Sequence, residues 1–169
     1  RIPNFIGAAK ACEKLLELKE FKVAECVFCA PDSSLKRARE LALENKKILA
    51  VATPHMKKIL EISNIDSKKI NFATTIKGFE IFGKPLKSIV DIFIQGAVSV
   101  DLKGNRLGKG TGYGDKEYWY LKAKNLLSEN AIVVAIVHEL QILNDFSELA
   151  MEHDVKVNYI ITPERIIKC

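Results

Sequence analysis

The sequence lacks any apolar run approaching the roughly 18 residues that a membrane-spanning helix needs, and no signal peptide is visible. We therefore expect a cytoplasmic protein with no membrane partner. Internal repeats, low-complexity tracts and linkers rich in glycine, proline or serine are also missing. At 169 residues, the chain suits one domain that covers residues 1–169 and buries a real core.

Cysteine is scarce, and its spacing does not build a recognisable site. The chain has 4 cysteines, of which Cys26 and Cys29 form one C-x-x-C pair without a second pair downstream. This pair lies in an apolar, strand-like run, where alternation would send the two side chains to opposite faces. We therefore expect structural thiols in a reduced compartment rather than a zinc or redox site.

No block of like charge stands out. The 26 Lys and Arg residues are dispersed among 21 Asp and Glu residues, which leaves a net charge of +5. A moderately basic protein favours anionic ligands, but dispersed charge is typical of a solvated surface rather than of a nucleic-acid interface. We do not expect a nucleic-acid partner.

Glycine, in contrast, is concentrated in residues 104–115, which read GNRLGKGTGYGD. Glycine permits positive φ and close backbone approach, as a cradle of main-chain N–H groups around a phosphate requires. The spacing matches neither a Walker loop nor a dinucleotide-binding turn. Spacing alone therefore leaves a flexible connection and a phosphate-binding loop equally open.

The neighbours of these glycines favour the phosphate-binding loop. A helix is predicted from Lys116, so the last glycines would lie at a helix N-terminus, where free N–H groups attract anions. Arg106 and Lys109 add full positive charges, and Asp115 is the type of ligand that Mg²⁺ takes.

Buried strand-like runs alternate with helical patterns along the chain. This rhythm predicts a three-layer α/β/α sandwich with a mostly parallel sheet. The carboxyl end of the central strand leads into the glycine-rich loop, where open α/β sheets bind ligands. The expected strands cover residues 25–30, 47–53, 88–95, 131–137 and 156–161, and the expected helices cover residues 6–18, 35–45, 56–62 and 116–129, with a short helical turn at 145–151.

Four further residues have two open interpretations. His55 is either a surface-loop histidine or a substrate ligand. Trp119 either packs in the core or stacks on a flat ring. His138 and Glu139 follow a buried strand, so they either face the cleft or form polar caps over that strand.

Two segments resemble a known family. Residues 101–115 look like the glycine-rich ATP loop of 5-formyltetrahydrofolate cyclo-ligases, also called methenyltetrahydrofolate synthetases. Residues 152–163 resemble the carboxy-terminal segment of that family, with an acidic residue, His153-Asp154, and a strand ending in Thr162. The resemblance spans essentially the whole chain. It implies the Rossmann-like architecture shared with ribose-5-phosphate isomerases and CoA transferases.

The resemblance implies ATP- and Mg²⁺-dependent conversion of 5-formyltetrahydrofolate, or a related formylated pterin, to the 5,10-methenyl form, with release of ADP and phosphate through a phosphorylated formyl intermediate. Folate and ATP would be the small-molecule partners of a monomer or homodimer. Arg106 and Lys109 would be catalytic through their charge on phosphate, and Asp115 would hold the metal. The cofactor-binding residues would be Gly108, Lys109, Gly110, Thr111, Gly112, Tyr113 and Arg1.

Two further site residues, Arg1 and Asp32, are expected from the family resemblance. Because the chain starts at Arg1 rather than methionine, we expect part of the natural amino terminus to be missing, with Arg1 as the last of the basic nucleotide-binding residues that the family carries there. The family also places a folate-recognising carboxylate at the first strand-to-helix corner. Asp32 is the nearest acidic residue, and it either takes that role or caps the helix.

The loop departs from the typical family pattern Gly-Gly-Gly-Tyr-Tyr-Asp-Arg. This chain has Gly114 in place of the second tyrosine and Lys116 in place of the arginine, and Ala150 replaces a usual proline. These features resemble the divergent methenyltetrahydrofolate-synthase-domain branch. A noncatalytic nucleotide- or RNA-binding module that retains the fold is therefore the alternative function, and a sugar-phosphate isomerase rests on fold analogy alone.

Overall fold

Buried apolar strands form an eight-stranded sheet at the centre of the computed structural model, which describes residues 1–169. The sheet order is β11-β10-β8-β5-β1-β2-β3-β4. The five strands from β10 to β2 pair in parallel, while β3, β4 and β11 add antiparallel edges. The strands are β1 (Cys26–Cys29), β2 (Ile48–Ala52), β3 (Ile59–Ile62), β4 (Lys84–Pro85), β5 (Val90–Gln95), β8 (Leu127–Ile136), β10 (Tyr159–Ile161) and β11 (Ile166–Lys168).

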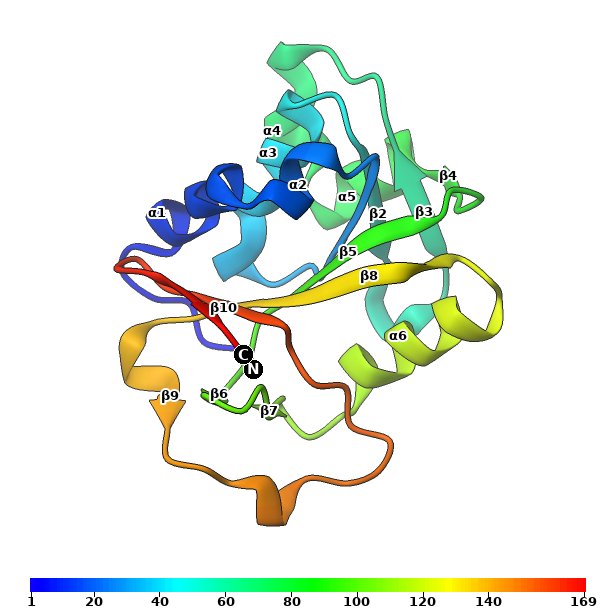
Figure 1. Ribbon diagram of the computed structural model, residues 1–169. Helices are drawn as coiled ribbons and strands as arrows, with labels where there is room; N and C mark the ends of the chain where they lie inside the picture. The colour runs from blue at the N-terminus through cyan, green and yellow to red at the C-terminus, as the bar shows by residue number, and fades with distance from the viewer.

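Both faces of this sheet are covered, which explains why its central strands are mostly apolar. Five helices cover one face, and α6 lies on the other (Figure 1). Strand β1 shows the alternation, since Val27 and Cys29 pack toward the first set while Phe28 stacks on Phe93 at 4.4 Å on the α6 side. The helices are α1 (Ala8–Glu13), α2 (Lys19–Val23), α3 (Lys36–Glu44), α4 (Ile70–Ala73), α5 (Ile76–Phe82) and α6 (Tyr113–Ala123). The predicted three-layer sandwich with a mostly parallel sheet is confirmed.

A small second sheet lies on the α6 side of the molecule (Figure 1). Its strands are β6 (Ser99–Asp101), β7 (Arg106–Leu107) and β9 (Ile142–Leu143). Strand β6 pairs antiparallel with β7 and parallel with β9. The glycine-rich stretch leaves from β7, so this sheet fixes one end of the loop and the N-terminus of α6 fixes the other.

Three helix predictions need correction. Residues 56–62 do not form a helix, because Ile59–Ile62 pairs with β2 as the antiparallel strand β3. The helix predicted at 116–129 is α6, which spans 113–123; Asn125 then takes a positive φ of 56°, and β8 follows. The helix predicted at 6–18 is broken, since α1 passes into a 3₁₀ turn, Lys14–Glu17.

The predicted placement of Cys26 and Cys29 on opposite faces of their strand is confirmed. All four cysteines are free, and Cys26 and Cys29 lie on opposite faces of β1. Burial raises the pKa of each of these two thiols to about 12, so both remain protonated and unreactive. None of the helices combines the length and apolar character needed to span a membrane.

Candidate functional site

The carboxyl ends of β1, β2 and β5 open into a cleft of about 1160 Å³, the position where parallel sheets bind ligands. Its walls come from residues 30–32 after β1, 52–56 after β2, 95–96 after β5, and 106–117, which include most of the glycine-rich stretch. The remaining wall comes from the segment before β10, through Leu149, Met151, His153 and Asp154.

The glycine-rich loop crosses the rim of this cleft and enters α6. Gly110 and Gly112 have φ values of 94° and 70°, a left-handed conformation that favours glycine. Gly112 is the N-cap of α6 and provides no side-chain cap, so first-turn N–H groups remain without a partner from the helix itself. The positive end of the helix dipole adds to these donors. The rim therefore suits a phosphate group.

Two cations contribute to the rim in different ways. Lys109 lies exposed in the loop and forms no ion pair within the chain. The Arg106 side chain is only 6% exposed and lies beneath the loop, where Nη2 is 3.3 Å from Asp115 Oδ1 and Nη1 donates to the Gly96 carbonyl at 3.3 Å. Arg106 therefore orients Asp115 and adds its charge from below, whereas Lys109 is free to contact a ligand.

Asp115 stands in the first turn of α6, with its Oδ1 atom also 3.3 Å from the backbone nitrogen of Val155. The chain contains no group of three or more His, Cys, Asp or Glu side chains arranged to hold a metal ion. Mg²⁺ needs no such group, because it keeps several waters and is usually held by one or two carboxylates plus phosphate oxygens. A single carboxylate such as Asp115 is therefore compatible with Mg²⁺.

The floor of the cleft carries a different set of polar groups. Gln95 is 2% exposed, and neither amide atom has a hydrogen-bond partner; the Ser34 hydroxyl also lacks one. Burial raises the pKa of Glu117 to about 7, and the nearby charge of Asp32 adds to this effect. Burial also raises the pKa of Asp32, although Lys109 and Arg39 oppose it. This floor combines two carboxyls with the unpaired Gln95 amide, whereas the Ser34 hydroxyl lies near Gly96 without lining the cleft.

Aromatic side chains line the outer part of the cleft. Trp119 is 41% exposed and donates its indole N–H to the His153 carbonyl at 2.7 Å. His55 Nδ1 lies 3.2 Å from the Tyr113 hydroxyl, which bridges the loop after β2 and the start of α6. His55 and Met56 both have positive φ, at 59° and 54°, an uncommon conformation for non-glycine residues that clusters at functional sites.

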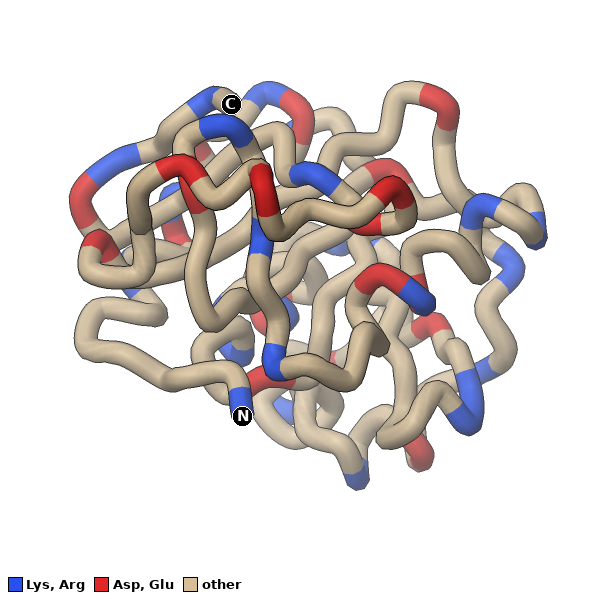
Figure 2. The backbone as a smooth tube through the Cα atoms, turned by 90° about the horizontal axis from the view of Figure 1, so that it is seen from below, with Lys and Arg blue, Asp and Glu red and all other residues tan.

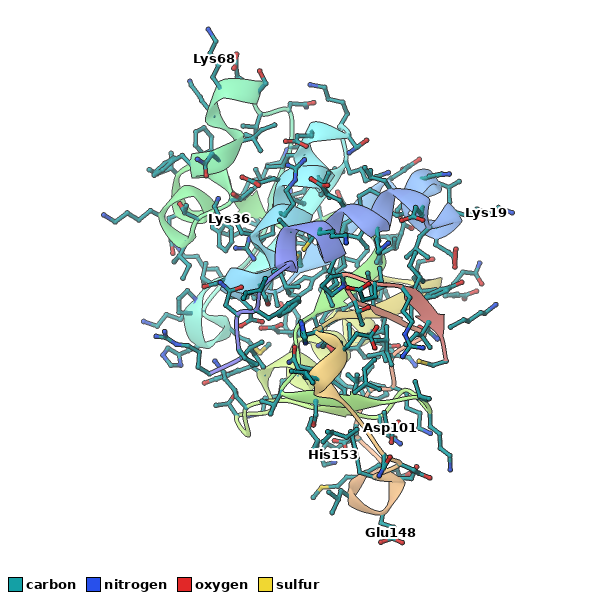
Figure 3. The ribbon with its side chains drawn as sticks, turned by 90° about the vertical axis from the view of Figure 1, so that its left-hand side faces the viewer. Lys19, Lys36, Lys68, Asp101, Glu148 and His153 are labelled. Atoms are coloured by element: carbon teal, nitrogen blue, oxygen red, sulfur yellow. The ribbon has the colours of Figure 1, made fainter.

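The segment that closes the cleft is anchored by a buried carboxylate, Asp101. Its two oxygens accept hydrogen bonds from the backbone N–H groups of Lys103, Asn105 and Phe146 and from the Asn105 side chain, at 2.8–3.0 Å. Burial alone raises the pKa of Asp101, but these hydrogen bonds outweigh it and hold the pKa below its usual value. Asp101 and His153 lie in the lower part of Figure 3, above Glu148 at the tip. Asp101 thus ties the loop base to the 145–154 segment.

Most of the predicted site residues line the cleft together. They are Arg106, Gly108, Lys109, Gly110, Thr111, Gly112, Tyr113 and Asp115. Arg1 is exposed and does not line it; its neighbour Ile2 does. His138 and Glu139 are also elsewhere, because His138 caps a 3₁₀ turn and Glu139 pairs with Arg165.

The open interpretations of two cleft residues can now be narrowed. Asp32 makes no side-chain cap to the following 3₁₀ turn, so the helix-capping interpretation is wrong. Trp119 lines the cleft and is not part of the core. Sequence reasoning missed Gln95 and Glu117 as residues that line the floor. A glutamine that ends an otherwise apolar parallel strand was the available signal.

Comparison with known proteins agrees with this geometry. A family model described as the 5-formyltetrahydrofolate cyclo-ligase family matches residues 3–163. The chain belongs to the 5-formyltetrahydrofolate cyclo-ligase family. Within this family it is similar to the methenyltetrahydrofolate synthase domain-containing protein of Bos taurus, with 37% identity over 176 residues that cover 99% of this chain and 46% of the bovine protein. The mitochondrial 5-formyltetrahydrofolate cyclo-ligase of Arabidopsis thaliana is 24% identical over 169 residues, which cover 93% of this chain and 58% of the plant protein.

The bovine protein, like its counterpart in Danio rerio at 34% identity, is about twice as long as the matched region, so the chain spans about half the length of these relatives. Solved structures of family members share the fold. The 5,10-methenyltetrahydrofolate synthetase of Aquifex aeolicus has a TM-score of 0.61 at 18% identity, with 96% of this chain and 80% of that chain covered. The 5,10-methenyltetrahydrofolate synthetase of Mycoplasma pneumoniae has a TM-score of 0.57 at 18% identity, with 91% of this chain and 83% of that chain covered. The resemblance to the divergent branch of the family is confirmed.

Proposed function

We propose that the protein converts 5-formyltetrahydrofolate, or a related formylated pterin, to the 5,10-methenyl form and consumes ATP in the presence of Mg²⁺. Family membership supports the type of reaction. The observation that carries the proposal is the cleft rim, where a glycine-rich loop, a helix N-terminus and Lys109 meet at the mouth of a large cleft. A cleft of this size has room for a nucleotide beside a pterin.

The reaction needs activation because a formamide carbon is a poor electrophile. In the first step, the formyl oxygen attacks the γ-phosphorus of ATP, a new O–P bond forms, and the bond to ADP breaks. In the second step, N10 of the folate attacks the formyl carbon and gives up its proton, the C–O bond breaks, and phosphate leaves with the former formyl oxygen and takes up that proton. Phosphoryl transfer of this kind depends on alignment and charge neutralisation.

The residues of the rim would provide that alignment. The N–H groups around Gly108, Gly110 and Gly112 would hold phosphate oxygens, with Thr111 next to them. Lys109 would neutralise charge on the transferred group. Tyr113 would border the folate side of the cleft.

Below the loop, Arg106 would hold Asp115 in position through the contact at 3.3 Å. Asp115 would provide the protein ligand for Mg²⁺, which neutralises phosphate charge when bound. Replacing Asp115 with Asn should therefore raise the Mg²⁺ concentration required for half-maximal rate while leaving the fold intact.

The decisive experiment measures ATP turnover with Mg²⁺, with and without 5-formyltetrahydrofolate, while methenyl product is followed by absorbance. We expect substrate-dependent ADP release, and we expect Lys109→Ala to lower kcat/KM about 100-fold, because it removes a charge that stabilises the transition state. Lys68→Ala is the matched control, since Lys68 is exposed at the opposite end of the molecule from Glu148 (Figure 3). Lys68→Ala should retain full activity.

The opposite outcome is ATP binding without product from any formylated pterin, which would leave a noncatalytic binding module as the function. An RNA-binding module would show strongly salt-dependent affinity, as expected for a continuous basic surface. Lys and Arg segments instead alternate with Asp and Glu segments over the face shown in Figure 2. This arrangement supports a small-molecule ligand over RNA.

A further inference from the structure

The cleft divides into two regions of opposite hydrogen-bonding character. The rim offers donors and positive charge through Lys109 and the N-terminus of α6. The floor offers acceptors, since both the Asp32 and the Glu117 carboxyl lie there. Burial raises the pKa of both carboxyls, and nearby charges modify it. No protein group donates a hydrogen bond to either carboxyl. A buried amide without a partner, such as that of Gln95, is costly, and the two carboxyls beside it face the cleft, so this floor indicates a ligand that brings its own donors.

Backbone geometry brings the floor residues together. An ideal Cβ on Gly96 would lie 3.3 Å from Asp32 Oδ2 and 3.7 Å from Ser34 Oγ, so these two atoms flank one point next to Gln95. An ideal Cβ on Gly114 would lie 2.7 Å from Gln95 Nε2, so α6 passes directly over the Gln95 amide.

Glu117 follows Gly114 by three residues on α6 and therefore lies on the same helix face, one turn further along. It is only 7% exposed, yet it lines the cleft. Gln95, which is 2% exposed, has an amide donor and an amide acceptor that both lack partners. An amide side chain matches a ligand edge that carries a carbonyl next to an N–H group. A carboxylate matches two N–H donors side by side.

We propose that Glu117 and Gln95 form a specificity subsite for the planar ring edge of the substrate, in which Glu117 accepts hydrogen bonds from an exocyclic amine and the adjacent ring N–H while Gln95 pairs with the neighbouring carbonyl. This inference rests on the proposed function and deepens it. The ring would enter the floor with its amine-bearing edge first, which leaves the rest of the substrate directed toward the cationic rim. The chemical class recognised is a 2-amino-4-oxopyrimidine edge.

The test compares two ring probes in calorimetric titrations without ATP, at pH 7.5, where the ionised form of Glu117 predominates. Pterin carries the 2-amino-4-oxo edge, whereas lumazine has a second carbonyl in place of the amine. We expect the wild-type chain to bind pterin at least tenfold more tightly than lumazine, because the lumazine carbonyl would face the Glu117 carboxylate. Glu117→Gln should bring the two affinities within about threefold of each other, since an amide can donate to that carbonyl. Glu129→Gln, a matched change at an exposed position, should keep the wild-type preference.

Gln95→Leu provides a second readout that distinguishes recognition from a structural role. If the amide serves a ligand, its replacement removes an unpaired buried polar group, so the melting temperature of the ligand-free chain should rise while pterin affinity falls at least tenfold. A fall in melting temperature together with unchanged pterin affinity would overturn the role of Gln95. A preference for pterin that survives Glu117→Gln would overturn the role of Glu117.

These outcomes are independent of turnover. If the chain shows the Glu117-dependent preference but forms no methenyl product, the subsite is supported and the proposed reaction is wrong. If the chain forms product from 5-formyltetrahydrofolate but shows equal affinities for pterin and lumazine, the proposed reaction is supported and the subsite is wrong.

Discussion

Asp101 and Glu117 are both buried carboxyls, but their surroundings differ completely. Four hydrogen bonds converge on Asp101 from the turn at 103–105 and from Phe146, so its charge is fully compensated. Glu117 faces the cleft beside Asp32, and burial raises its pKa to about 7. The Asp101 network is complete within the chain, whereas the floor of the cleft is not. Compensated burial marks structure, and uncompensated burial beside a cleft marks a place for a ligand.

The largest expected effect comes from breaking the complete network. Asp101→Asn replaces an acceptor oxygen with an NH₂ group that faces existing N–H donors, so it should destabilise the fold by about 3 kcal/mol. Urea unfolding at pH 7 would measure this loss. Asp66→Asn is the matched control, because Asp66 is exposed and asparagine caps a helical turn about as well. Equal stability of the two variants would show that Asp101 does not hold the closing segment.

The same network predicts a pH dependence. Because the folded-state pKa of Asp101 lies below its unfolded value, the ionised form stabilises the fold above about pH 4. This contribution is lost as the pH falls through the folded-state pKa. The difference in unfolding free energy between the wild-type chain and Asp101→Asn should therefore shrink when urea unfolding is repeated near pH 2. A difference that stays constant from pH 7 to pH 2 would contradict the lowered pKa.

Two glycine substitutions compare the turn beside Asp101 with the rim of the cleft, and we expect them to cause intermediate losses of stability. Gly104, in the turn beside Asp101, has a φ of 87°, and an added Cβ would lie 2.5 Å from the Val157 carbonyl oxygen. Gly110, in the loop at the rim, has a φ of 94° but open space around an added Cβ. Gly104→Ala should cost about 3 kcal/mol from strain and collision together, and Gly110→Ala about 1 kcal/mol from strain alone. Thermal unfolding of both variants would compare them, and a reversed order would contradict the geometry.

The smallest expected effect has the opposite sign. Gln95→Leu removes the two unpaired amide atoms under α6, so it should stabilise the ligand-free fold by about 1 kcal/mol. Urea unfolding of the ligand-free chain would measure the gain. Destabilisation would show that the amide has a structural partner, and the contrast between the network and the floor would then fail.

Sequence alone predicts the layers of the fold and the rim of the site. Continuous apolar runs at 25–30 and 47–53 identify strands covered on both sides, and glycine with neighbouring charge identifies the loop. The short, mostly apolar run at 59–62 could not be assigned by periodicity, because four residues are too few to distinguish a helix from a strand. Its pairing with β2 in the structure identifies it as a strand. The end of α6 depended on the left-handed turn at Asn125, which residue propensity does not determine.

The floor of the site could not be predicted, because its members come from three distant parts of the chain. Asp32 follows β1, Gln95 ends β5, and Glu117 lies on α6. Their proximity is produced by the parallel register of β1 and β5 and by the passage of α6 over Gln95. The Arg106–Asp115 contact could not be predicted either, because a sequence does not show whether an arginine is exposed to a ligand or buried against a carboxylate.

Trp119 is the single tryptophan of the chain, and it stands half-exposed in the wall of the cleft with its indole N–H bound to the closing segment. The protein therefore carries a built-in fluorophore at its own site. Ligand entry that displaces water from the indole, or that moves the segment around His153, should change the emission intensity and wavelength without any attached dye. Stopped-flow fluorescence could then resolve the order in which nucleotide and pterin enter the cleft.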